Sequence, residues 1–313
     1  MSIFNEYNVK RKVFGTNLAL LSVLTKPKLN ILPFNKKFKQ YYNNEVLKFI
    51  NINYTYIINI YKLKVNKNEK IEENSNIWVF WWQGIDNAPD VVKRCIDNII
   101  INKGNHRVII ISKYNYNDYI DIPNYILEKV GNGSITLTHF SDIIRTMLLA
   151  DHGGIWIDAT VFITKEFPKE IYNYSFYSNK IEVNNDEYIS QGKWSAFFLC
   201  CSRKNLLACF TRDVLLAYWE QYDELITYFF IDYIIFTGYQ YISGIHDYID
   251  SVPYNNSNIY EFINNINKEY DKEKYIDITK DTWLFKLSWK HKYIKNTYDK
   301  KETFYKKMID GEL

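Results

Sequence analysis

The sequence SDIIRTMLLADHGGIWIDAT at residues 141–160 combines a helix, a helix stop and a strand in one short stretch. Ser141 is a typical N-cap, and the residues after it predict a helix that runs to about Asp151. The pair Gly153-Gly154 ends that helix, and the apolar residues at 155–163 predict a buried strand. A helix that leads directly into a buried strand is typical of α/β folds.

The same alternation extends upstream to Asn76 and continues to residue 163, and the pattern changes after Thr164. Strands are predicted at residues 77–82, 106–112, 134–138, 155–163, 175–181 and 194–202, and helices from about Asn87 to Gly104 and at 123–130, 205–222 and 224–241. This pattern predicts an α/β layer fold with a mostly parallel sheet. Ligands in such folds bind at the carboxyl ends of strands, so the candidate segments are residues 82–87, 112–117, 140–145 and 158–160.

Composition excludes some classes of protein and indicates the compartment. The 313 residues are 47% hydrophobic and 24% charged, which excludes a wholly disordered chain. The 39 basic and 36 acidic residues nearly balance, so a general nucleic-acid binder is not indicated. Four cysteines without a C-x-x-C pair predict reduced residues in a reducing compartment. No signal peptide is expected at the N-terminus.

The chain divides by composition into two parts. Residues 1–75 read as an N-terminal helical region, with helical spacing from about Asn35 to Tyr61, followed by a polar linker. Residues 76–313 read as the main domain. Its tail is polar except for the aromatic island 282–289, which is expected to close over ligand as a lid at about residues 282–291.

One stretch, residues 225–245, is long and apolar enough to be mistaken for a membrane span. Asp232 is its single charge, and a carboxylate near the centre of a span costs about 2.5–3.5 kcal/mol. We therefore expect a buried helix and no transmembrane segment. Asp232 either caps another element or works near the reacting sugar or acceptor; a buried charge normally has a partner or a task.

The residues that carry chemistry lie in the stretch first quoted. Side chains at i and i+2 of a strand share a face, so Asp158 and Thr160 are expected to point the same way at a strand end. Two oxygen ligands suit Mg²⁺ or Mn²⁺, which would neutralise a leaving diphosphate. Asp142 and Arg145 share a helix face, where they suit sugar hydroxyls and phosphate.

Each of these residues also has a plain structural explanation. Asp142 can complement a helix dipole, and Arg145 can pair with it on the surface. Gly153-Gly154 can be a simple helix stop, and Asp158 can be a turn former. Their combination at a strand–helix switch favours a site.

At these residues the sequence closely resembles the sugar-donor signature of glycosyltransferase family 32. It looks most like the branch called capsular polysaccharide synthesis proteins, and the large clostridial glucosylating toxins carry related versions. The resemblance spans about residues 76–291. It rests on Ser141-Asp142-x-x-Arg145, on residues 153–158, on Ile77-Trp78-Val79-Phe80-Trp81-Trp82-Gln83-Gly84, and more weakly on residues 229–233 and 286–290.

The resemblance implies a GT-A fold, a Rossmann-like nucleotide-sugar-binding α/β domain with added helices. It maps the first position of a metal-binding Asp-x-Asp motif to Asp158, whereas the third position is Thr160, which departs from the pattern. It implies a retaining transfer, with Mn²⁺ or Mg²⁺ as cofactor. Its donor is a nucleoside diphosphate sugar, for which UDP is favoured.

The resemblance also assigns the donor site. Trp82, two residues before Gly84, would stack on the base, although aromatic core packing is the common alternative. Asp142 and Arg145 would grip the donor sugar and its phosphate. Ser288 and Trp289 would close over the diphosphate. Independently of the resemblance, Lys286 lies beside Ser288 and Trp289 and is expected to offset phosphate charge; the alternative is a solvated tail.

The sequence therefore predicts a metal-dependent glycosyltransferase that elongates a bacterial capsular or other surface polysaccharide. Its partners would be a nucleotide sugar and an oligosaccharide or lipid-linked glycan acceptor, with no nucleic acid. It would work in the cytoplasm, with peripheral association at the inner face of the membrane. The alternatives are a glycosyltransferase that modifies a protein and a non-catalytic nucleotide-sugar-binding protein, which the departure at Thr160 keeps open.

Overall fold

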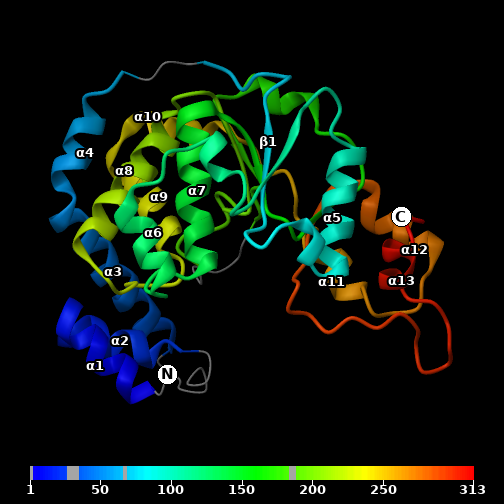
Figure 1. Cartoon of the computed structure of the whole chain (residues 1–313), viewed down its shortest axis with the longest axis horizontal. Coiled ribbons are helices and arrows are strands. Elements are labelled where there is room, and N and C mark those ends of the chain that lie inside the picture. The colour runs from blue at the N-terminus through cyan, green and yellow to red at the C-terminus, as the bar shows by residue number, and fades with distance from the viewer. Residues whose placement is uncertain (1–2, 27–34, 66–68, 183–187) are drawn as a thin grey trace.

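The centre of the molecule is a five-stranded sheet with the strand order β2-β1-β3-β6-β5. The computed structural model describes residues 3–26, 35–65, 69–182 and 188–313 (Figure 1). The strands are β1 (Ile77–Phe80), β2 (Val108–Ile111), β3 (Gly154–Ile157), β5 (Phe176–Ser178) and β6 (Phe198–Cys201). β1 is parallel to β2 and β3, whereas β6 is antiparallel to β3 and β5. Four strands thus share one direction, which confirms the predicted α/β fold with a mostly parallel sheet.

Helices pack on both sides of β1, as Figure 1 shows. One group holds α6 (Asn124–Gly131), α7 (Leu137–His152), α8 (Leu206–Gln221), α9 (Phe230–Tyr241) and α10 (Ser243–Ser251). Within it α7 contacts β1, β3 and β6, and α10 contacts β5. The other group holds α5 (Asp90–Ile101), α11 (Glu261–Asn265), α12 (Lys272–Lys280) and α13 (Phe304–Ile309). The apolar face of α5 that the sequence predicted is buried, including Val92, Ile96 and Ile99.

A second, two-stranded sheet joins β4 (Val161–Ile163) to β7 (Leu284–Lys286). The prediction of one strand over residues 155–163 is therefore wrong. The chain turns at Asp158, where the Val161 amide donates to the Asp158 carbonyl (2.9 Å), and β3 and β4 belong to different sheets. Asp158 and Thr160 consequently sit in a turn, not on one face of a strand.

The N-terminal region is helical, as predicted, and packs directly on the main domain. Its helices are α1 (Ile3–Phe14), α2 (Thr16–Leu24), α3 (Asn35–Asn53) and α4 (Thr55–Lys62). The Tyr233 hydroxyl donates to Asn43 Oδ1 (2.6 Å), and Lys10 Nζ donates to the Ile226 carbonyl (3.0 Å). Contacts of this kind tie α1 and α3 to the segment around α9. The boundary near residue 75 stays a prediction.

Two helix starts differ from the expectation. No strand forms over residues 134–138, because Thr136 caps α7 by accepting a hydrogen bond from the His139 amide (3.3 Å). Ser141 is therefore not a cap but lies inside α7, where its hydroxyl donates to the Thr138 carbonyl (2.6 Å). Asn87 is likewise not the cap of α5, since it ends a 3₁₀ turn (Ile85–Asn87) and Pro89 precedes the helix.

The apolar stretch at residues 225–245 is broken into shorter pieces. α9 begins at Phe230, not near Glu224 as predicted, and α10 starts directly after Ile242. In the part of the chain that the structure describes, each helix is too short or too polar to cross a membrane.

The glycine pair before β3 is required by close backbone contacts. Gly153 and Gly154 have φ angles of 68° and 97°, in the left-handed region. A Cβ on Gly154 would lie 2.4 Å from the Asn76 carbonyl oxygen, and one on Gly153 would lie 2.6 Å from the Arg203 amide nitrogen. The Trp78 indole also donates to the Gly153 carbonyl (2.8 Å). The pair lets β3 insert between β1 and β6, which is more than a helix stop.

We predict that Gly154→Ala lowers the free energy of unfolding by about 3 kcal/mol or more. The substitution adds an overlap with backbone to the cost of a left-handed conformation. Gly133→Ala is the matched control, because Gly133 has a similar φ of 84° and open space at its Cβ. It should cost about 1–2 kcal/mol. Urea unfolding measures both, and equal losses would contradict the role assigned to the close contact.

Candidate functional site

The site is built around Asp158, which directly follows β3. One carboxylate oxygen, Oδ1, accepts hydrogen bonds from the Trp156 indole (3.0 Å) and from Arg145 Nη2 (3.1 Å). The other, Oδ2, accepts one from Lys286 Nζ (2.9 Å). A helix, a strand and the distant β7 thus supply the partners of one carboxylate.

The charges around Asp158 decide its ionisation. Burial alone would raise the pKa of the carboxyl group, but the nearby Lys286 and Arg145 and the hydrogen bonds from Lys286 and Trp156 lower it overall. The side chain of Asp158 is 27% exposed, and that of Lys286 is 21% exposed. Asp158 is therefore a fixed negative charge that remains within reach of solvent.

Arg145 is the inner partner of two carboxylates. Its Nη1 lies 3.0 Å from Asp142 Oδ1 while its Nη2 contacts Asp158, and its guanidinium lies 4.9 Å from the centre of the Trp156 ring. Arg145 and Asp142 were predicted to grip the donor. The Arg145 side chain is only 4% exposed, so its position suits holding Asp142 and Asp158 in place. The ion pair of Arg145 with Asp142 is buried, so the alternative prediction of a surface pair is wrong.

His139 extends this cluster and was missed by the sequence analysis. Its Nδ1 lies 3.4 Å from Asp142 Oδ2, and its ring packs against Trp219 and Phe230. The side chain is 2% exposed. The signal was present in the sequence, because His139, Asp142 and Arg145 repeat every three residues and share a face of α7.

Lys286 bridges Thr160 and Asp158. Lys286 Nζ donates to Thr160 Oγ1 (2.8 Å) as well as to Asp158 Oδ2. The two oxygens that the sequence assigned to Mn²⁺ or Mg²⁺ therefore already share an ammonium group. Across residues 3–26, 35–65, 69–182 and 188–313, no group of three or more His, Cys, Asp or Glu side chains is arranged to hold a metal ion.

This donor set does not fit a divalent cation. Such an ion takes several oxygen ligands, which are carboxylates, neutral carbonyl or hydroxyl groups, or waters. Here one carboxylate is shared by two cationic side chains, Lys286 and Arg145. A metal would have to displace Lys286 Nζ from between Asp158 and Thr160.

Asp232 lies in the first turn of α9, where it accepts a hydrogen bond from the Trp194 indole (2.7 Å). Burial raises the pKa of its carboxyl group to about 6, helped by the charge of Asp142 and opposed by the Trp194 bond and by Arg145. Because Asp142 and Arg145 act on it electrostatically, Asp232 belongs to the same neighbourhood as Asp158. Trp194 is a partner that the sequence analysis did not identify.

Trp82 and Gly84 lie at the carboxyl end of β1, as predicted. Their surroundings differ from each other, because Trp82 packs on aromatic rings whereas Gly84 lines a cavity. Trp82 is half-buried and packs on Phe140 and Tyr116, with ring centroids 5.1 and 5.6 Å apart. A cavity of about 460 Å³ opens beside Gly84, and it is lined by residues 83–87, Ile110, Ser112 and Tyr114. Its exposed aromatic ring is Tyr114, which is 70% exposed.

The predicted lid is partly a buried strand. Leu284, Phe285 and Leu287 are at most 2% exposed, because β7 pairs with β4 in the second sheet. The expected weak packing begins only beyond this strand, where Trp289 is 50% exposed and its ring lies 6.3 Å from that of Trp81. Closure of the segment over ligand stays a prediction.

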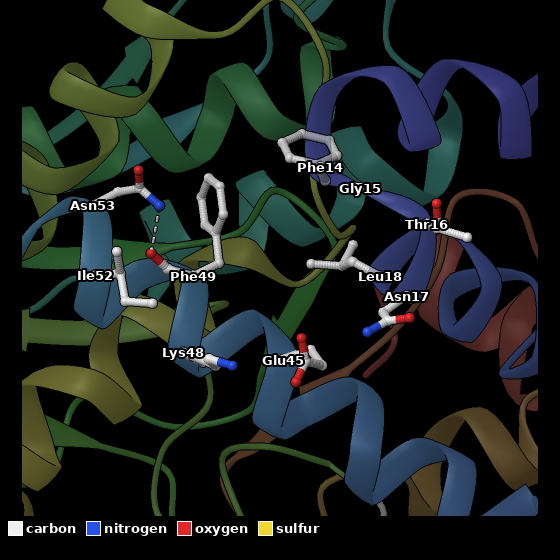
Figure 2. A pocket seen from close by; sticks show the side chains of 10 residues that line it. All are labelled: Phe14, Gly15, Thr16, Asn17, Leu18, Glu45, Lys48, Phe49, Ile52 and Asn53. Atoms are coloured by element: carbon white, nitrogen blue, oxygen red, sulfur yellow. Dashed lines mark hydrogen bonds between the residues drawn. The ribbon is translucent and has the colours of Figure 1, made fainter.

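A second cavity, of about 390 Å³, lies between the start of α2 and the face of α3. Figure 2 shows Phe14, Leu18 and Phe49 at its wall, and the Asn53 side chain donating to the Phe49 carbonyl (2.8 Å). None of the residues predicted for the site lines this cavity. The chemistry-bearing residues gather at the sheet edge instead.

Comparison with known sequences identifies a family that covers most of the chain. The profile of a family described as capsular polysaccharide synthesis protein matches residues 27–308. This match includes the whole central sheet, the second sheet and all residues assigned to the site.

Two individual proteins are also similar. "O-glycosyltransferase braB" of Annulohypoxylon truncatum is 30% identical over 102 residues, which are 30% of this chain and 24% of that protein. The chain thus spans about a quarter of that relative's length. The solved structure "PaToxG Glycosyltransferase" is 15% identical and covers 79% of this chain and 98% of its own, with a TM-score of 0.40, too low to establish a common fold.

The raised pKa of Asp232 predicts a specific pH dependence of stability. Because the pKa is about 6 in the folded protein and 3.8 for an unperturbed group, the folded state binds more protons between these values. The free energy of unfolding contributed by Asp232 should therefore fall as pH rises from about 4 to 6. Relative to wild type, Asp232→Asn should gain on the order of 3 kcal/mol across this window.

Urea unfolding between pH 4 and pH 8 measures this difference. Asparagine can still accept the hydrogen bond from Trp194, so the packing is kept while the ionisation is removed. Asp281→Asn, at an exposed position, is the control and should not follow the same curve. A constant difference between Asp232→Asn and wild type over this range would show that Asp232 is not a buried, titrating carboxyl group.

Proposed function

This chain belongs to the family of capsular polysaccharide synthesis proteins, and from that premise we propose that it is a glycosyltransferase. It moves a sugar from a nucleoside diphosphate donor, UDP being favoured, to a hydroxyl group of a capsular or other surface polysaccharide. The transfer is proposed to be retaining, as the resemblance of the signature at residues 141–158 implies. A relative that matches part of the chain is described as an O-glycosyltransferase, which supports the same class of reaction.

The observation that carries this proposal is the convergence of two cationic side chains on Asp158 at the carboxyl edge of β3. Ligands of α/β sheets bind at this edge. β1 and β3 are parallel and in register at Trp78 and Trp156, so their carboxyl ends meet there. The guanidinium of Arg145 is buried between Asp142 and Asp158, whereas the ammonium of Lys286 is the accessible positive charge at this edge, which suits a diphosphate.

The chemical step needs stabilisation of a leaving group. The bond between the anomeric carbon and the diphosphate oxygen breaks, and its electron pair stays on that oxygen. A bond from the acceptor oxygen to the anomeric carbon forms, and the hydroxyl proton passes to the released diphosphate. Fixed positive charge beside that oxygen lowers the barrier, because negative charge develops on the oxygen in the transition state. Lys286 and Arg145 carry such positive charge, and their ion pairs with Asp158 hold it in place.

The donor base is assigned to the cavity beside Gly84. Gly84 has a φ of 84°, and a Cβ there would lie 3.3 Å from Tyr114 Cε2. Its missing side chain lets the Tyr114 ring lie against the backbone at the cavity wall. A flat exposed ring suits stacking on a nucleobase. Trp82, the residue that the resemblance suggests, is engaged by Phe140 and Tyr116.

The acceptor is proposed to be an oligosaccharide or a lipid-linked glycan, met in the cytoplasm at the inner face of the bacterial membrane. All four cysteines, at positions 95, 200, 201 and 209, are free thiols, and burial raises the pKa of each. Free thiols suit a reducing compartment.

We predict that Asp158→Asn lowers the rate of sugar transfer by about 100-fold or more. Loss of one preorganised electrostatic group at a reacting centre typically has an effect of this size. The measurement is release of nucleoside diphosphate from a panel of nucleotide sugars, with the polysaccharide acceptor and with water. The melting temperature of each variant shows whether the fold is kept.

Asp121→Asn is the matched control, because Asp121 is exposed and is not among the partners of Asp158. Its rate should equal that of wild type. Wild-type turnover in Asp158→Asn would remove Asp158 from the site. Nucleotide-sugar binding without any transfer or hydrolysis in the wild type would support the alternative of a binding protein.

We also predict that Tyr114→Ala weakens donor binding by about 1–3 kcal/mol at unchanged melting temperature, as expected when a ring stacks on a base. Trp82→Ala should instead lower the melting temperature, because its ring packs on Phe140. Calorimetric titration with nucleoside diphosphates and thermal unfolding test the two variants side by side. The reverse pattern would return the base-stacking role to Trp82.

A further inference from the structure

The ammonium group of Lys286 lies where a divalent cation would be expected. It bridges Asp158 Oδ2 (2.9 Å) and Thr160 Oγ1 (2.8 Å), the two oxygens at the positions of an Asp-x-Asp motif. The ammonium also lies over the Phe197 ring, with Nζ 5.0 Å from the ring centre. The position of this charge is therefore fixed from three sides.

The backbone also fixes Lys286. β7 pairs with β4, so that Lys286 stands opposite Val161 in the antiparallel register. The Leu287 amide donates to the Thr160 carbonyl (2.8 Å), which closes the strand onto the turn that carries Asp158. A lysine on a buried, paired strand loses little conformational freedom when it binds a ligand, since the folded protein has already ordered it.

Lys286 still has capacity to bind. An ammonium group has three N–H donors, and Asp158 and Thr160 take two of them. The side chain is 21% exposed, whereas that of Arg145, the other cation at Asp158, is 4% exposed. A ligand that arrives at this edge therefore meets the lysine and not the arginine.

We propose that Lys286 takes the place of the divalent cation, so that the diphosphate binds directly to its ammonium group and transfer needs no metal ion. Asp158 and Thr160 act as positioning residues for Lys286. In the transfer step the electron pair of the breaking C–O bond passes to the diphosphate oxygen, whose charge Lys286 neutralises. A neutral hydroxyl at Thr160 suits this role, because a second carboxylate beside Asp158 would add negative charge where the diphosphate has to bind.

This inference rests on the proposed function, and the experiment is chosen to separate the two. Binding of UDP, GDP, dTDP and ADP to the full chain is measured by calorimetric titration, in EDTA and in Mn²⁺. The variants are Lys286→Met, which keeps an unbranched apolar side chain but removes the charge, and Lys286→Arg, which keeps the charge. Lys165→Ala is the matched control, because Lys165 lies beyond the far end of β4 and donates to the Thr279 carbonyl (3.2 Å).

We expect at least one of the nucleotides to bind wild type equally well in EDTA and in Mn²⁺. Lys286→Met should weaken this binding by about 10- to 100-fold, the usual effect of removing a hydrogen bond to a charged group. Lys286→Arg should recover part of the loss, and Lys165→Ala should match wild type. Release of nucleoside diphosphate from the corresponding nucleotide sugar should show the same order and the same indifference to EDTA.

Two results would overturn the inference and leave the proposed function standing. The first is nucleotide binding by wild type that requires Mn²⁺. The second is EDTA-insensitive binding that Lys286→Met does not weaken. If Lys286→Met fails to fold, the comparison of wild type in EDTA and Mn²⁺ decides alone. Absence of binding for all four nucleotides in both conditions would instead remove the proposed function itself.

Discussion

Asp158 brings a negative charge to a largely enclosed position at the end of β3, and the arrangement around it follows from the need to compensate that charge. A carboxylate that leaves water loses several kcal/mol of solvation unless it is paired and hydrogen-bonded. Here Trp156, Arg145 and Lys286 supply the hydrogen bonds, and two of these residues also supply positive charge. Arg145 in turn forms an ion pair with Asp142. Positive and negative side chains therefore alternate from Lys286 in β7 to Asp142 in α7.

This constraint explains why the strand after Asp158 leaves the central sheet. The turn at Asp158 ends β3 and lets β4 pair with β7, an element 128 positions later in the chain at Lys286. A single straight strand through residues 155–163 would have kept β4 beside β1 and β6. Pairing of β4 with β7 in the second sheet therefore brings Lys286 to the carboxylate of Asp158.

The sequence predicted local features well and this long-range arrangement poorly. The α/β class, the strand at residues 108–111 and the helix from Leu206 after the Asn205 cap follow from patterns within a few residues. The break at Asp158 was not predicted, since the residues on either side of it are apolar and a turn at Asp158 was only the alternative explanation of that residue. The pairing of Lys286 with Asp158 depends on the β4–β7 register, which no local spacing encodes. Strand spacing paired Asp158 with Thr160, and the resemblance covered the stretches that hold Asp158 and Lys286, but neither indicated that the three side chains touch.

The two acidic residues nearest the predicted chemistry are tuned in opposite directions. Cationic neighbours lower the pKa of Asp158, whereas burial raises the pKa of Asp232 to about 6. Carboxyl groups whose environments separate their pKa values in this way can take separate tasks in one site. Asp158 stays charged at neutral pH and can hold Lys286 in every step of a cycle. Asp232, with a pKa of about 6 and the Trp194 indole as its hydrogen-bond donor, can exchange a proton near neutral pH while the indole keeps it in place.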